Sequence, residues 1–252
     1  MKPCPLIRIA LVFFGLLAAL CMQTAALGNS SSVRGSGHVT LTTRHLAGFH
    51  GVVLELPADL TIIQGTTEGV SIETDDNIAP LIETVISAGQ LVLRSRQGAS
   101  IQPSTLKMVV NIRQVNAVAV SGAGNISADG LVSSGLTLQI SGSGDMDFAK
   151  IKANTLTLSV SGAGNVRASG QADTVSASIS GTGDLKMESL AAKNVKLSIA
   201  GAGDATVWAS QTLAVTVGGA ANVKYYGDAA VTQAITGTGS VTRLGSSPKN
   251  RP

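Results

Sequence analysis

A five-residue phrase occurs seven times in the chain. In this phrase two glycines alternate with small residues, and an Asn, Asp or Ser is the last residue. Its copies read SGAGN at 121–125, SGSGD at 141–145, SGAGN at 161–165, SGTGD at 180–184, AGAGD at 200–204, GGAAN at 218–222 and TGTGS at 236–240. Successive copies begin 20, 20, 19, 20, 18 and 18 residues apart. A period near 20 residues is typical of a solenoid, in which each coil buries its apolar face only against its neighbours.

The segments between the phrases predict strands. They alternate apolar with polar residues and are rich in Val, Ile, Thr and Ser, as in LTLSVSGAGNVRA at 156–168. Before residue 115 the repeat is looser, but 53–56, 60–63 and 70–73 also alternate, so we expect irregular coils of the same solenoid there. The sequence therefore predicts an all-β fold: a single-stranded, right-handed parallel β-helix from 39 to 244, with about ten coils of 18–20 residues.

The phase of the alternation places the glycines of the phrase on the inward side. Around the copy at 161–165 the apolar residues all have even numbers, and so do Gly162 and Gly164. Two backbones fit this phase: a sharp bend at the glycines, which tolerate positive φ, or an extended chain over an interior too narrow for side chains. We favour the bend, because each coil must turn and no better turn signal exists within the strands. Either backbone makes the glycines structural.

The other three positions of the phrase then face outward and stack in columns about 4.8 Å apart from coil to coil. Side chains of an Asn/Asp column can hydrogen-bond along the stack, each amide donating to the next oxygen. Asp204 follows Asp184 in this column without an Asn between them, so we expect one of the two carboxyls to have a raised pKa or to hold a cation. The columns are Ser121, Ser141, Ser161, Ser180, Ala200, Gly218, Thr236; Ala123, Ser143, Ala163, Thr182, Ala202, Ala220, Thr238; and Asn125, Asp145, Asn165, Asp184, Asp204, Asn222, Ser240.

The phrase fits poorly with the known glycine-rich ligand sites. In the calcium-binding nonapeptide of β-helices the aspartate comes one position later and the period is nine, and Asn replaces Asp in about half of the coils here. A phosphate-binding glycine loop precedes a helix, whereas a strand follows every phrase here. His38, His45 and His50 cluster near the start, but without a cysteine or patterned carboxylates we expect exposed or capping histidines and no metal site.

The N-terminus has the features of a secretory signal peptide at 1–26. Lys2 and Arg8 precede an uncharged apolar run of 14 residues, 9–22, and small residues follow. Both cysteines, Cys4 and Cys21, lie in this segment, so the mature chain is expected to lack disulfides. Without Lys2 and Arg8 the 18 basic residues fall to 16 against 15 acidic ones, so nothing favours nucleic acid as a partner. We expect flexible segments at 27–38 and 245–252, and no membrane span in the mature chain.

The order of these features resembles a known family. TRHLAGFHGVVLELPADLTIIQG at 43–65, VSIETDDNIAPLIETVISAGQLVLRS at 70–95 and the serial SGAGN and SGSGD phrases are similar to the head GIN domain of auto-transporter adhesins. The resemblance covers about 39–244. It implies a fold like that of pectate-lyase-type β-helices without their catalytic residues, and a role at the cell surface or in adhesion.

These observations lead to one functional hypothesis and one alternative. We expect an exported, non-catalytic β-helix without a cofactor, in the periplasm or at the cell surface, that serves adhesion, binding or scaffolding through its flat Ser/Ala/Asn/Asp faces. Its partners would be cell-envelope or host glycans or proteins, or further copies of itself. The alternative is an enzyme of the pectate-lyase-like type that acts on cell-envelope polysaccharide, with a site in the loops of the first half. The expected binding residues are the outward polar ones: Ser121, Ser141, Ser161, Ser180, Asn125, Asp145, Asn165, Asp184, Asp204 and Asn222.

Overall fold

The computed structural model describes residues 32–248, and these form an all-β structure with almost no helix. The N-terminal part contains β1 Ser32–Arg34, β2 Val39–Arg44, β3 Gly51–Leu54, β4 Asp59–Gln64, β5 Gly69–Asp75, the 3-10 helix η1 Ala79–Leu81, β6 Ile82–Ser87, β7 Gln90–Ser95, β8 Ser100–Gln102 and β9 Leu106–Ile112. The C-terminal part contains β10 Ala117–Val120, β11 Asn125–Asp129, β12 Val132–Ile140, β13 Met146–Val160, β14 Val166–Ile179, β15 Leu185–Ile199, β16 Ala205–Val217, β17 Ala220–Tyr226, β18 Ala230–Ile235 and β19 Thr238–Gly245. The expected signal peptide, 1–26, lies outside the described residues.

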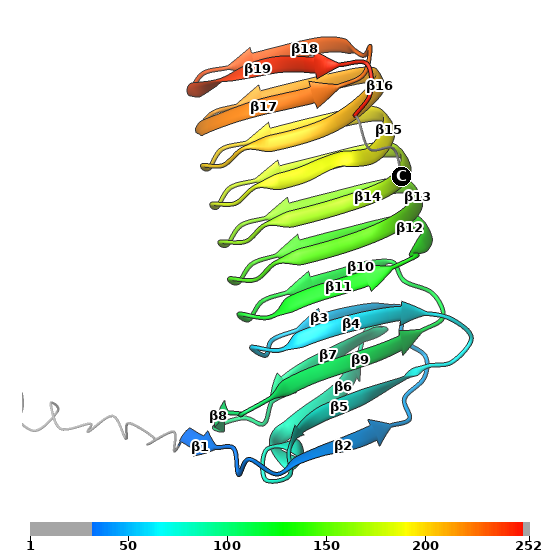
Figure 1. Cartoon of the computed structure of the whole chain (residues 1–252), viewed down its shortest axis with the longest axis vertical. Coiled ribbons are helices and arrows are strands. Elements are labelled where there is room, and N and C mark those ends of the chain that lie inside the picture. The colour runs from blue at the N-terminus through cyan, green and yellow to red at the C-terminus, as the bar shows by residue number, and fades with distance from the viewer. Residues whose placement is uncertain (1–31, 249–252) are drawn as a thin grey trace, which may run out of the picture. The chain divides into compact units, whose positions relative to one another are not determined.

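The C-terminal part is a β-solenoid of about six turns, as Figure 1 shows from the green coils upward. Every pairing from β10 to β19 is parallel, and each strand lies against the strand about one period away. The strand before a phrase forms one wall of a coil, and the strand after it forms the next wall. Strands β13 to β16 are 13–15 residues long because each continues from the second wall of one coil into the first wall of the next.

The interior of the solenoid follows the alternation in the sequence. Within one coil Leu156, Leu158 and Val160 are buried, and so are Val166 and Ala168 beyond the phrase. The residues between them along β13 and β14 are exposed or half-buried. The predicted inward phase is therefore confirmed, and one continuous apolar column runs through the stack.

The first part of the chain does not consist of regular coils, which corrects the expectation of about ten. Strand β5 lies antiparallel to β2 and to β9, and β6 lies antiparallel to β7. The β6–β7 reversal takes two residues, Ala88 and Gly89, which both have positive φ (50° and 74°). Two such residues form the tight hairpin turn whose twist matches that of paired strands. The parallel stack continues here from β10 and β11 into β3 and β4, and from these into β7 and β9.

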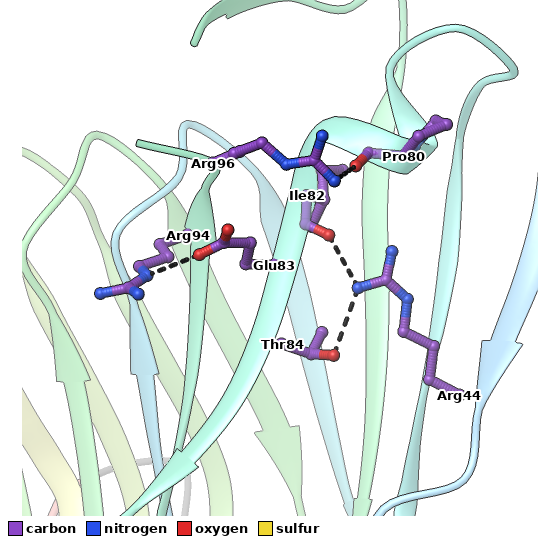
Figure 2. A network of polar contacts seen from close by, with 7 residues as sticks. All are labelled: Arg44, Pro80, Ile82, Glu83, Thr84, Arg94 and Arg96. Atoms are coloured by element: carbon purple, nitrogen blue, oxygen red, sulfur yellow. Dashed lines mark hydrogen bonds and ion pairs between the residues drawn. The ribbon is translucent and has the colours of Figure 1, made fainter. Parts of the chain in front are cut away.

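These antiparallel strands cover the N-terminal end of the apolar column. The half-buried Arg44 at the end of β2 donates from Nη1 to the carbonyl oxygen of Ile82 (2.8 Å) and the hydroxyl of Thr84 (3.2 Å), and from Nη2 to the carbonyl oxygen of Ala79 (3.0 Å). Figure 2 shows the Ile82 and Thr84 contacts beside the Arg94–Glu83 ion pair. Burial lowers the pKa of Arg44 from its ordinary value. Arg44 thus fixes β2 to the η1–β6 segment.

A buried carboxylate ties the chain start to the same end. Asp75, at the end of β5, accepts from the backbone N–H of Gly37 (2.7 Å), and from the N–H and hydroxyl of Ser104 (2.7 Å each). The hydrogen bonds from Ser104 hold the pKa of Asp75 below its ordinary value, although burial acts in the opposite direction. Residues 32–34, which the sequence placed in a flexible segment, form β1 and pair with β8.

Candidate functional site

The seven phrases form one corner of successive coils. The phrase at 161–165, for example, connects the end of β13 at Val160 to the start of β14 at Val166. The central residues of the phrases pair in parallel from coil to coil: Ser143 with Ala163, Ala163 with Thr182, Thr182 with Ala202, and Ala202 with Ala220. The second predicted column therefore exists. We call the outward surface of the phrases, 121–125 through 236–240, the corner face.

The Asn/Asp column forms a hydrogen-bonded ladder along the corner face. The side-chain oxygen of each rung accepts the backbone N–H of the next rung, as from Asp145 to Asn125 (3.2 Å), from Asn165 to Asp145 (2.8 Å) and from Asp184 to Asn165 (3.0 Å). Where Asn follows Asp, the amide also donates to the same carboxylate oxygen, at 3.1 Å for Asn165 and 3.2 Å for Asn222. The sequence predicts side-chain bonds along this column, and the structure adds the backbone donors.

The contact between Asp184 and Asp204 differs from the expected meeting of two carboxylates. Asp184 Oδ1 accepts the backbone N–H of Asp204 at 2.9 Å, so a carboxylate faces an amide. Asp204 Oδ1 in turn accepts the N–H of Asn222 at 3.0 Å. Within residues 32–248, no three His, Cys, Asp or Glu side chains lie close enough to hold a metal ion together. A backbone donor therefore meets each carboxylate of this pair, and the cation stays a prediction.

The serine column lies beside the ladder. Ser121, Ser141, Ser161 and Ser180 are exposed and occupy equivalent places in four consecutive coils. The hydroxyl of Ser141 lies 3.4 Å from the carbonyl oxygen of Val120, and that of Ser161 lies 3.4 Å from the carbonyl oxygen of Ile140, in each case in the preceding coil. This is the length of a weak hydrogen bond. The corner face contains a hollow of about 590 Å³ between the second and third columns of the coils from 125 to 184. All ten predicted site residues therefore share this face, and their binding role stays a prediction.

The structure gives a different reason for the glycines of the phrase. The chain does turn at this corner, but Gly162 and Gly164 do not have positive φ. A Cβ on Gly162 would lie 1.9 Å from the carbonyl oxygen of Gly142, and one on Gly164 would lie 2.0 Å from that of Gly144. The missing side chain would thus point along the stack into the preceding coil. At Gly162 and Gly164 close approach of two backbones requires glycine. The equivalent Gly183 and Gly203 also have positive φ (155° and 148°), so the predicted conformational reason applies in those two coils.

The first rung of the ladder was not recognised in the sequence. Asn125 pairs with Asp59 in the β11–β4 register and donates from Nδ2 to Asp59 Oδ1 at 3.0 Å. Residues 55–59, ELPAD, form the corner of this coil, with the buried Leu56 and Ala58 where later coils have glycine. In the neighbouring coil the chain from β7 to β9 passes through β8 and forms no tight corner. No backbone of that coil therefore approaches residues 55–59 closely enough to require glycines there. Asp59 lies 66 residues before Asn125, far outside the 20-residue period, so the strand alternation on both sides of ELPAD was the one signal available.

The structure also shows where the three histidines lie. His38, His45 and His50 are exposed in the N-terminal part, as expected. No helix within 32–248 has the length and apolar character needed to cross a membrane.

The comparisons with known proteins bear on the whole solenoid and its cap. A family profile described as "Putative auto-transporter adhesin, head GIN domain" matches residues 48–229. The chain belongs to this family. The resemblance seen in the sequence is therefore confirmed, over most of the range from which it was inferred. No curated protein matches the chain.

Solved structures share the fold. A "putative adhesin" from Bacteroides fragilis superposes with a TM-score of 0.81 at 21% identity, over 84% of this chain and 100% of that one. A "putative adhesin" from Parabacteroides distasonis gives a TM-score of 0.69 at 24% identity, also over 84% and 100%. A "putative lipid binding protein" from the same species gives 0.71 at 18% identity, over 84% and 99%. At these identities the likeness establishes the solenoid and its antiparallel cap, while function requires argument from the surface.

Proposed function

We propose that this head GIN protein is an exported or cell-surface, non-catalytic adhesion module that contacts its partner through the corner face. The proposal rests on one observation: the polar side chains of this face are held by the backbone ladder. The ladder oxygens accept N–H groups at 2.8–3.2 Å, so the side chains are fixed before any partner arrives. A surface that is ordered in advance loses little side-chain entropy on binding.

The composition of the corner face also favours contact over chemistry. Its outward residues are Ser, Ala, Thr, Asn and Asp, so no long side chain of the phrases stands between the backbone and a partner. Only one oxygen of Asp145, Asp184 and Asp204 takes part in the ladder, which leaves the other for a hydroxyl or amide donor. Flat rows of such groups suit a cell-envelope or host glycan, a protein surface, or the same face of a second copy. The family description and the names of the structural relatives support an adhesin-like role.

A steric block tests whether the corner face is used. Ala163 is exposed at the centre of the face, and Ala163→Arg would place a long side chain there with little effect on the core. Ala214 is an equally exposed alanine in β16, away from the phrases, so Ala214→Arg is the matched control. Binding of the labelled mature protein to bacterial and host cells, and to glycan and matrix-protein arrays, measures the effect. Loss of retention with Ala163→Arg alone supports the proposal, and equal retention by both variants would refute it.

A charge substitution tests the role of the ladder carboxylates. Changing Asp145, Asp184 and Asp204 together to Asn removes three charges but keeps an oxygen acceptor at every rung. We expect the folded stability to change little and the retention on the arrays to fall. The polysaccharide-cleaving alternative stays a prediction.

A further inference from the structure

A second surface groove lies at another position of the coils and involves no residue of the phrases. It has a volume of about 320 Å³ and is lined by residues of four consecutive coils: 152–154, 171–173, 191–193, and Trp208 with Ser210. Its volume falls within the range of small-ligand sites in proteins. The strand register shows how this groove is built.

Three columns form the groove. The strand pairings align four buried alanines, Ala153, Ala172, Ala192 and Ala209, and the first three of them provide a low floor of the groove. One wall is formed by the residues that directly precede these alanines in the sequence, and the other wall by the residues that directly follow them. The first wall contains Lys152, Gln171, Ala191 and Trp208, and the second contains Asn154, Asp173, Lys193 and Ser210. At the strand spacing of about 4.8 Å, the three steps between the first and last coil span about 14 Å.

Trp208 closes one end of the groove at the place where the coils become shorter. Val207 and Trp208 are adjacent in β16, but their partners in β15, Met187 and Ala191, are separated by three residues. The spacing of the phrases falls from 20 to 18 residues at the same point. Trp208 therefore lies at the shortened corner, and its neighbour in the first wall is the small Ala191. The side chain is half-buried, so part of the ring remains accessible.

The polar groups of the groove are partly fixed and partly free. Lys193 Nζ lies 2.7 Å from Asp173 Oδ1, which orients both side chains along the second wall. The hydroxyl of Ser210 donates to the carbonyl oxygen of Ala192 at 3.1 Å. Lys152, in contrast, forms no ion pair with any residue between 32 and 248. The groove thus offers amide, carboxylate and ammonium groups along a floor of alanines, with an aromatic ring at its end.

We propose that this groove binds an oligosaccharide chain that lies along the stack, with one sugar ring packed on Trp208. The C–H face of a sugar ring is apolar and its rim carries hydroxyls, so it needs an aromatic surface beside polar side chains. Gln171 and Asn154 supply amides on opposite walls for the hydroxyls. The unpaired ammonium of Lys152 favours a sugar that carries a carboxylate at the far end of the groove. This site is separate from the corner face and does not depend on its function.

The chain contains one tryptophan, so its fluorescence reports on this site alone. The mature protein is titrated with cello-oligosaccharides, chito-oligosaccharides and oligogalacturonates, and the emission of Trp208 is followed. We expect a saturable change in emission with at least one of these series, with oligogalacturonates bound most tightly and that preference lost in Lys152→Gln. No response to any of the three series would overturn the proposal.

Variants measured by calorimetry separate this groove from other surfaces. Trp208→Ala should abolish binding, and Trp208→Phe should retain part of it. Gln171→Ala should weaken binding about tenfold, as expected for a lost hydrogen bond. Gln139→Ala, an exposed glutamine in β12 outside the groove, is the matched control and should bind as the wild type does. Binding that survives in Trp208→Ala, or that is lost in Ala163→Arg on the corner face, would overturn the assignment to the groove.

Discussion

The substitution Gly162→Ala tests the finding that backbone approach requires glycine in the phrase. The first glycine of the phrase is present in all seven copies, whereas the second is replaced by the buried Ala221 in one of them. The new Cβ would lie 1.9 Å from the carbonyl oxygen of Gly142, whereas about 3.0 Å is the closest that real Cβ atoms approach. The two coils must therefore separate by about 1.1 Å at this corner.

This separation affects the hydrogen bonds that join the two coils. The N–H of Ala163 donates to the carbonyl oxygen of Gly142 at 3.0 Å, and the N–H of Ser161 donates to that of Ile140 at 2.8 Å. A shift of about 1 Å would lengthen both beyond hydrogen-bonding distance. Two lost bonds at about 1 kcal/mol each, together with about 1–3 kcal/mol of overpacking, predict a destabilisation of about 3–5 kcal/mol.

The measurement is the urea midpoint followed by far-ultraviolet circular dichroism. Gly135→Ala is the matched control, because Gly135 lies in β12 with ordinary φ and no atom within 4 Å of the added Cβ. We expect that control to unfold at the wild-type midpoint or slightly above it, since alanine reduces the entropy of the unfolded chain. If Gly162→Ala unfolds together with Gly135→Ala, the coils have room for a side chain, and the close-approach argument fails.

Three further outcomes follow from single contacts. Asn165→Ala removes the acceptor of the Asp184 N–H and should lower stability by about 1 kcal/mol in thermal melts, while Asn165→Asp keeps the acceptor and should cost less. Glu188→Met removes Oε2, an enclosed oxygen without a partner, and should raise the urea midpoint by the equivalent of about 1 kcal/mol; an unchanged midpoint would contradict this. Ser104 holds the pKa of Asp75 in the folded protein below its ordinary value of 3.8. The stability that ionised Asp75 contributes should therefore be complete above pH 3.8, decline as the pH falls below 3.8, and vanish below the folded-state pKa. Asp75→Asn should flatten the acid side of a curve of stability against pH.

Repetition made the solenoid predictable from the sequence. Seven copies of one phrase fix the register of the coils, and the period-two alternation then assigns each residue to the interior or the surface. For this reason the buried phase of 156–168 and the alignment of Asn125 with Asp145 agree with the structure. The first part of the chain has no such repeat, and the turn at Ala88 and Gly89 sends β7 back along β6, which local alternation does not reveal.

Three features could not be predicted from the sequence, for physical reasons. The alternation tells which side of a strand a residue faces, but not how near the next coil lies, so the reason for Gly162 became visible only in the structure. The groove at Trp208 depends on irregular pairing between β15 and β16, and a single aromatic residue in a strand gives no sign of that irregularity. The first rung, Asp59, was hidden because its corner contains Leu56 and Ala58 in place of glycines.

The ladder on the corner face has a direction, and that direction has a consequence for how the chain folds. From Asn125 to Asp204 every side-chain oxygen of the ladder accepts an N–H from the coil that comes later in the sequence, and Asn222 accepts the hydroxyl of Ser240 from the next coil in the same direction. A finished coil therefore presents acceptors that only the next segment to emerge can use. The antiparallel cap, which is synthesised first, provides the initial surface. The chain can thus fold vectorially, one coil at a time in the order of its synthesis, without waiting for its C-terminus.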